Sequence, residues 1–167
     1  MQDTDYPGFE EAVRGLAGLP CSVIAATAGC GSMILLYFGD TYWETVTLPS
    51  FGSRTFEKAV YGVSLDFAAW RCRQGAHMLC SSSSRNGVAS PMELGLAKLM
   101  GMNVLEVRLE EPAADLHLVF EDGLTFDIFC DQVDTEEDPH DNYSFRCPAG
   151  SFIVGPGSRL RFEPHVG

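Results

Sequence analysis

The stretch Trp70–Leu79, WRCRQGAHML, decides how this sequence is divided, because a similar stretch recurs at Phe145–Val154, FRCPAGSFIV. The two stretches align without a gap at a spacing of 75 residues. They share an aromatic residue, an Arg, a Cys and a Gly at matching positions, and both end in two apolar residues. Strand-like residues on both sides of a glycine-containing turn are typical of a β-hairpin. We therefore predict that the chain builds the same hairpin twice.

Further matches extend the repeat over both halves of the chain, in the same order. At spacings of 82 or 83 residues the matching segments are Leu16–Gly18 with Leu99–Gly101, Val23–Ala25 with Leu105–Val107, and Ile34–Asp40 with Leu116–Asp122. Between the halves lies Ser81–Ser90, SSSSRNGVAS, whose serine, asparagine and glycine residues favour turns and indicate a linker. We therefore expect two repeats, residues 1–84 and residues 85–167.

Each repeat is predicted to begin with one short helix. In the first, Phe9, Val13 and Leu16 recur at the spacing of one helical face, and Gly18 and Pro20 end the pattern. In the second, Ser90 is placed to cap a helix over Pro91–Met100, with proline at the first helical position.

About five strands are predicted to follow each helix. In the second half Leu105, Val107 and Leu109 alternate with charged residues, which is typical of a strand buried on one face. Turns are expected at Gly39–Asp40 and Asp122–Gly123, and Val63–Cys72 is expected to form one strand. The predicted fold class is therefore α+β and mostly antiparallel β, with the two repeats related by an approximate two-fold axis.

The chain is strongly acidic, with a formal net charge of −12, divided as −3 over residues 1–84 and −9 over residues 85–167. Such a field repels nucleic acid and anionic membranes and attracts cationic partners, although acidity can also serve solubility alone. No apolar run reaches the roughly 18 residues of a membrane span. The acidic start lacks the features of a signal peptide. We therefore expect a soluble cytoplasmic protein whose six cysteines are thiols.

The sequence contains none of the common active-site motifs. It has no GxSxG elbow, no HExxH and no CxxC pair, and the four histidines are scattered. Gly29–Cys30–Gly31 is followed by strand-like residues and no lysine, which argues against a phosphate-binding loop. We therefore predict no catalytic, cofactor-binding or metal-binding residues. His117 is expected to be a solvated or hydrogen-bonded imidazole on the polar side of a strand.

One segment, residues 131–141, concentrates negative charge. Its six carboxylates are Asp131, Asp134, Glu136, Glu137, Asp138 and Asp141. The segment lacks the central glycine and the final glutamate of a calcium-binding loop. It is either a solvated acidic loop or a docking surface for a basic protein. In the second case the expected partner-binding residues are these six together with Glu106, Glu110 and Glu111.

Residues 91–163 resemble small uncharacterised bacterial proteins of the immunity-protein type, and residues 9–80 resemble them in degraded form. The shared pattern is a short helix, a Gly-x-x-Val strand, an acidic-Leu-x-Leu-x-Phe-x-Asp-Gly hairpin, an aromatic residue and a final Val-x-Gly strand. The residues that fit are Gly101, Val104, Asp115, Leu116, Leu118, Phe120, Asp122, Gly123, Phe145, Val154 and Gly155. The resemblance implies a role in neutralising a secreted bacterial toxin, often a nuclease.

Three hypotheses follow. The leading one is a cytosolic, non-enzymatic protein whose acidic surface blocks a cationic toxin domain, with charge complementarity speeding association. The second is a non-catalytic scaffold or ligand-binding module that uses the groove between the repeats, with Tyr42, Trp43 and Trp70 as candidate lining. The third and least favoured is an enzyme, which would require Cys, His and Asp side chains to converge in one cleft.

Overall fold

The structure, a computed structural model, describes residues 6–26, 31–133 and 139–165. In these ranges the first half forms α1 (Tyr6–Arg14), β1 (Cys21–Ala25), β2 (Ile34–Leu48), β3 (Gly52–Leu65), β4 (Ala69–Gln74) and β5 (His77–Ser81). The second half forms α2 (Pro91–Ala97), β6 (Val104–Glu110), β7 (Asp115–Phe120), β8 (Leu124–Phe129), β9 (Tyr143–Cys147), β10 (Gly150–Val154) and β11 (Leu160–Pro164). All strand pairs are antiparallel, which confirms the predicted α+β class dominated by antiparallel sheet. Neither helix in these ranges is long and apolar enough to span a membrane.

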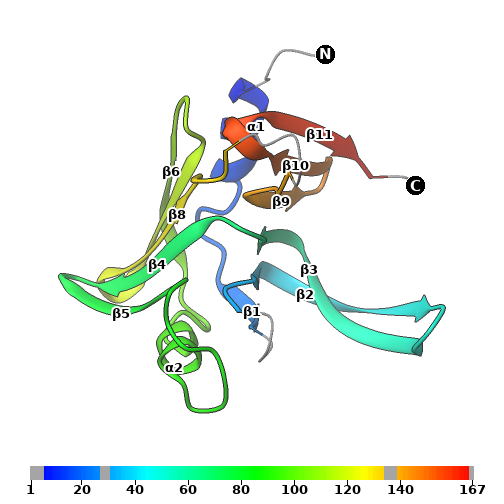
Figure 1. The fold of residues 1–167 in the computed structure, drawn as a ribbon, viewed down its shortest axis with the longest axis horizontal. Coiled ribbons are helices and arrows are strands. Elements are labelled where there is room, and N and C mark those ends of the chain that lie inside the picture. The colour runs from blue at the N-terminus through cyan, green and yellow to red at the C-terminus, as the bar shows by residue number, and fades with distance from the viewer. Residues whose placement is uncertain (1–5, 27–30, 134–138, 166–167) are drawn as a thin grey trace.

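The strands form two sheets, and each sheet contains strands from both halves of the chain (Figure 1). The order in the first sheet is β1-β2-β3-β9-β10-β11, and the order in the second is β6-β7-β8-β4-β5. The hairpin β4–β5 of the first half therefore extends the sheet of the second half, and β9–β10 extends the sheet of the first. Apart from β11, each strand of one sheet has a counterpart at the same place in the other.

The register across the sheets places buried residues in rows. One row crosses the first sheet through Ile34, Leu65 and Tyr143, and another crosses the second sheet through Leu116, Ile128 and Trp70. Tyr143 and Trp70 each stand in such a row, in different sheets.

The two aromatic residues at these places make matching hydrogen bonds. The indole N–H of Trp70 donates to the Ser32 carbonyl at 2.9 Å, and the Tyr143 hydroxyl donates to the Ala114 carbonyl at 2.7 Å. Both side chains are at most 1% exposed. Each bond stays within one half of the chain and ties a strand of one sheet to the loop before a strand of the other sheet.

The segments that join each helix to its first strand pair with one another. Pro20 forms an isolated antiparallel bridge with Asn103. On either side, two bonds run from the first half to the second (Gly18 N to Val104 O, 2.7 Å; Cys21 N to Met102 O, 2.9 Å), and two run back (Gly101 N to Cys21 O, 2.8 Å; Val104 N to Leu19 O, 2.9 Å). The contact is thus reciprocal, as in the self-complementary interface of a two-fold dimer.

A single core lies between the apolar faces of both sheets and both helices. Phe38 of the first sheet stacks on Phe120 of the second at 6.4 Å between ring centroids. The ring centroids of Phe9 in α1 and Phe152 in β10 lie 5.1 Å apart, so the first helix covers strands of the second half. The predicted cap of α2 is confirmed, because the Ser90 hydroxyl accepts from the Glu93 N–H at 3.2 Å.

Two local predictions are wrong. The chain does not turn at Gly39–Asp40: β2 continues through a bulge between Phe38 and Thr41. Residues 39–60 therefore form a hairpin extension, here called the arm, which projects from the body of the protein (Figure 1). The equivalent place in the second sheet holds only residues 121–123. The second error is Val63–Cys72, which is broken at Asp66–Ala68, where three backbone N–H groups donate to the Asn142 carbonyl.

Candidate functional site

A row of charged side chains crosses the outer face of the second sheet. The register places Arg71 opposite Asp127, Asp127 opposite His117, and His117 opposite Arg108. Side chains alternate between the faces of a strand, so these four lie on the side away from the core. The apolar neighbours Trp70, Ile128 and Leu116 form the buried row behind them.

Asp127 is the centre of this row. Its side chain is 6% exposed and accepts from Arg71 Nε at 3.2 Å, Arg73 Nη2 at 3.2 Å and His117 Nδ1 at 2.8 Å. Burial works to raise the pKa of the carboxyl, but the bonds from His117 and Arg71 and the charge of Arg73 together lower it. Three strands are therefore held together by one ionised carboxylate.

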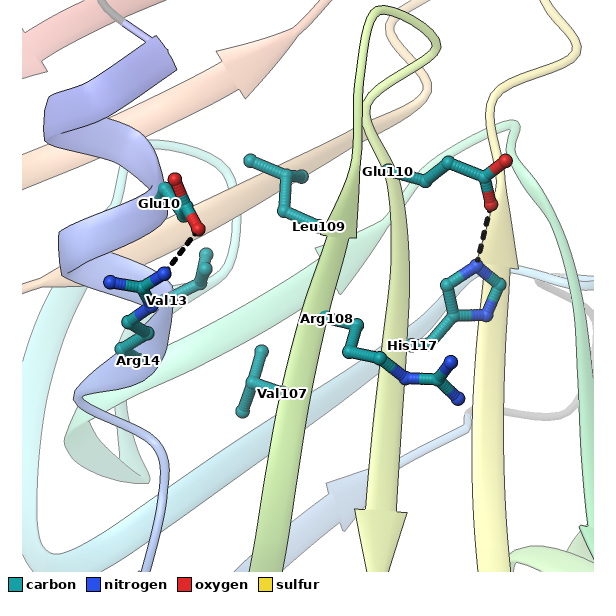
Figure 2. Close-up of a pocket in the computed structure, with 8 residues that line it drawn as sticks. All are labelled: Glu10, Val13, Arg14, Val107, Arg108, Leu109, Glu110 and His117. Carbon is teal, nitrogen blue, oxygen red and sulfur yellow. Dashed lines mark hydrogen bonds and ion pairs between the residues drawn. The ribbon is translucent and has the colours of Figure 1, made fainter.

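His117 continues the network to the edge of the sheet. Its second ring nitrogen lies 3.3 Å from Glu110 Oε2, at the end of β6 (Figure 2). Both ring nitrogens are thus engaged by carboxylates, as expected for a hydrogen-bonded imidazole. The arrangement orients the ring and fixes Glu110, whose side chain is 68% exposed.

A groove of about 560 Å³ lies beside this network, between α1 and the edge strand β6. Val107 and Leu109 point from β6 toward α1 and Val13, whereas Arg108, Glu110 and His117 lie on the other face of the sheet (Figure 2). Glu10 and Arg14 of α1 form an ion pair at its rim. This α1–β6 groove thus combines an apolar interior with a charged border.

The expected partner-binding residues fall into three groups. Glu106, Glu110 and Glu111 are exposed on β6 and directly after it, and Asp131 is exposed after β8. Asp141 is half-buried and takes two bonds from Arg161, at 3.0 and 2.8 Å. Asp134, Glu136, Glu137 and Asp138 lie outside the described residues.

The structure brings the start of the acidic segment to the turn after β6. The Cys130 N–H donates to Asp115 Oδ1 at 2.7 Å, and the Cys130 thiol donates to the Ala114 carbonyl at 3.4 Å. Cys130 is therefore bonded to residues at the end of the β6–β7 turn, and Asp131 is the next residue in the chain. The same turn begins at Glu111. Carboxylates separated in the sequence thus lie at one end of the second sheet.

Sequence reasoning missed two parts of this region. Burial and the neighbouring Asp141 raise the pKa of Asp66, which places that carboxyl near the acidic segment. Glu10, Val13 and Arg14 form the helical wall of the groove. Local sequence gives no signal for either, because α1 and Asp66 reach this region only through the exchange of strands between the halves.

The aromatic residues expected to line a ligand groove do not share a pocket. Trp70 is 1% exposed and stacks on Phe126 at 5.3 Å. Trp43 lies on the arm with 69% of its surface exposed, and the nearby Tyr42 hydroxyl accepts from Arg146 Nη2 at 3.1 Å. Trp43 borders a separate hollow of about 510 Å³ that also includes Leu35.

Over the described part of the chain, no three His, Cys, Asp or Glu side chains are grouped as metal ligands. Burial raises the pKa of the Cys21 thiol to about 12, and burial with Asp115 and Asp131 raises that of Cys130 to about 12. These two thiols therefore stay protonated near neutral pH, whereas a cysteine nucleophile reacts as the deprotonated thiolate.

The fold and this site define an α+β protein of two mostly antiparallel sheets with a carboxylate-rich edge beside an apolar groove. No protein-family model matches the chain, and neither the curated proteins nor the solved structures contain a match.

Proposed function

We propose that the protein binds a basic protein partner through the carboxylates at the β6 end of the second sheet. The observation that carries this proposal is the position of Glu106, Glu110 and Glu111, exposed along one edge strand beside Asp131. The partner that fits best is the cationic domain of a bacterial toxin, such as a nuclease, whose substrate-binding bases the carboxylates would cover in the cytoplasm.

Electrostatics accounts for how such a surface would work. The net charge of −12 draws a basic partner over distances of about a Debye length, roughly 10 Å at 0.1 M salt. Charge complementarity mainly raises the association rate and excludes acidic competitors. The apolar side chains of the α1–β6 groove then supply surface that can be buried after the encounter.

We further propose that the two halves are copies of one ancestral unit, related by an approximate two-fold axis. The exchanged strand order, the matching bonds of Trp70 and Tyr143, and the reciprocal contact around Pro20 and Asn103 support this proposal. In this arrangement the second copy carries the carboxylates and the first copy carries the arm, so the copies have diverged on their outer surfaces.

A second candidate function is small-molecule binding in the groove between the halves. It is favoured by the composition of the α1–β6 groove, in which Val13 comes from the first half and Val107 and Leu109 come from the second. A ligand there would shift the NMR signals of these three side chains and leave those of Glu106 and Glu111 unchanged.

The proposal predicts that a gene next to the one for this chain encodes a basic toxin domain, and that domain is the probe for partner binding. The triple variant E106K/E110K/E111K should weaken its binding by about a hundredfold, since each exposed charge contributes on the order of 1 kcal/mol. The control is E163K, because Glu163 is an equally exposed strand glutamate paired with Arg161, away from β6. Unchanged binding by the triple variant would contradict the proposal.

A further inference from the structure

Strand β6 is an edge strand with an open side. On the side away from β7, Val104 pairs through its N–H and C=O with Leu19 and Gly18. Past Val104, no described strand pairs with β6 on this side. In an antiparallel ladder, alternate residues direct their N–H and C=O groups to opposite sides. Every second residue of the remaining strand therefore directs its N–H and C=O groups toward the α1–β6 groove, where no strand among the described residues pairs with them.

The α1–β6 groove lies where one more strand would pair with β6. Its lining extends around the edge of the sheet, with Val107 and Leu109 on the inner face and Arg108 and Glu110 on the outer face (Figure 2). An extended peptide beside β6 would direct alternate side chains to these two faces. The inner side chains would meet Val13 of α1, and the outer ones would lie beside Arg108 and Glu110.

The charge on the edge strand itself distinguishes β6 from β1. β1 borders a groove of about 370 Å³ against α2, and its own sequence CSVIA carries no charge, because the two carboxylates of that groove, Glu57 and Glu93, come from β3 and α2. β5 packs against α2, and β11 ends in a proline. On β6 the outward residues Glu106 and Glu110 flank Arg108, which pairs with Glu106 at 3.3 Å, and Glu111 follows, so three carboxylates accompany one arginine. The occupant that fits is therefore an extended segment in which apolar and basic residues alternate.

We propose that the basic partner binds by adding such a segment as a strand to the open edge of β6, in the α1–β6 groove. Backbone hydrogen bonds supply affinity in this mode, and the alternating side chains supply specificity. The inference rests on the proposed function, because it specifies how the basic partner is held.

The probe is a capped nine-residue peptide in which lysine and valine alternate, with lysine at both ends. Titrated into the full-length chain in about 50 mM NaCl, it should slow amide hydrogen exchange along residues 105–110 by about tenfold or more. A peptide of the same composition with all lysines before all valines has equal charge and should bind about tenfold more weakly. The E106K/E110K variant should lose binding by about tenfold, and E163K should stay within about twofold.

Two N-methylated peptides isolate the contribution of the backbone. In an extended strand the N–H groups of lysines face one edge and those of valines face the other. One peptide is methylated on its valines and the other on its lysines. The peptide whose methyl groups face β6 should lose binding by about tenfold or more, while the other should bind within about threefold of the parent.

The outcomes separate this inference from the proposed function. If both methylated peptides and the blocked-sequence peptide bind as well as the parent, strand addition is overturned and the acidic docking surface stands. Equal loss of binding for both methylated peptides also overturns strand addition. If none of the four peptides binds in low salt, the inference and the proposed function both fail.

Discussion

Asp127 is the residue that holds the outer face of the second sheet together, since its carboxylate receives bonds from β4 and β7. Replacing it in the variant D127N removes a charge from three charge-assisted contacts. We expect the free energy of unfolding, measured by urea denaturation at neutral pH, to fall by about 2 kcal/mol. The control is D122N, which changes an exposed carboxylate in the β7–β8 turn and should cost little.

The pH dependence of this difference has a definite sign. Because the pKa of Asp127 is lowered in the folded state, its contribution is complete above the unfolded pKa, near 4. It is lost as the pH falls through the folded value. The stability gap between the native chain and D127N should therefore narrow below about pH 4. A gap that widens on acidification would show that Asp127 is not stabilised as an anion.

Tyr143 and Trp70 give a second test at this scale, because each donates one hydrogen bond from the core. The variant Y143F removes the hydroxyl that donates to the Ala114 carbonyl and should destabilise the fold by about 1–2 kcal/mol. W70F removes the indole N–H and also leaves a cavity, so its cost should be larger, about 2–4 kcal/mol. Thermal unfolding measures both. A neutral Y143F would mean that the bond to Ala114 does not contribute to stability.

At the level of elements, the arm is the part of the fold that distinguishes the two halves. It spans residues 39–60, and its exposed apolar residues include Trp43, Phe51 and Phe56. Replacing residues 39–60 by Glu-Asp-Gly, the sequence of residues 121–123, should give a folded protein. The core pairs below it, such as Leu36 with Val63, remain. Circular dichroism with a cooperative thermal transition checks this. Loss of cooperative folding would contradict the proposed equivalence of β2–β3 and β7–β8.

The sequence predicted most elements because the signals for them are local. The Ser90–Pro91 pair acts within one helical turn, and the cap that it predicts is confirmed. The alternation over Leu105–Leu109 correctly predicted a strand and the inward side of Val107 and Leu109. It was wrong for Leu105, which is 60% exposed beside the bulge between Val104 and Glu106. The arm was missed because Gly39, which has a positive φ of 84°, is typical of a turn, while here it lies in a bulge that lets the strand continue. The sequence also did not predict which strand each hairpin pairs with. Alternation of apolar and polar residues shows which face of a strand is buried, but it does not identify the neighbouring strand.

The repeat that divided the sequence illustrates the same limit. Gly75 has a φ of 57° in the β4–β5 turn, whereas Gly150 lies in β10, where a Cβ would sit 2.3 Å from the Glu163 carbonyl. The sequence comparison matched these two glycines because they are the same residue type. Their structural reasons differ: Gly75 allows a turn, and Gly150 allows a neighbouring strand to approach closely. Both predicted hairpins are present, as β4–β5 and β9–β10, but each lies in the sheet that contains the other half's strands.

At the scale of the whole molecule, the acidic residues and the apolar groove meet where the two halves join. The α1–β6 groove takes its helix from one half and its strand from the other, and the acidic segment begins beside it. Of the site, the sequence predicted the exposed glutamates of β6 but not the helix opposite them, because that contact depends on tertiary packing.

The central claim is that charge on this surface drives capture of a basic partner, and the association rate constant tests it most directly. In stopped-flow mixing with the basic toxin domain that a neighbouring gene is predicted to encode, the association rate constant should fall about tenfold or more between about 50 mM and 500 mM NaCl, while the dissociation rate constant changes little. In the E106K/E110K/E111K variant the association rate should be low at both salt concentrations. An association rate that is independent of salt, or equal for the two proteins, would contradict the account.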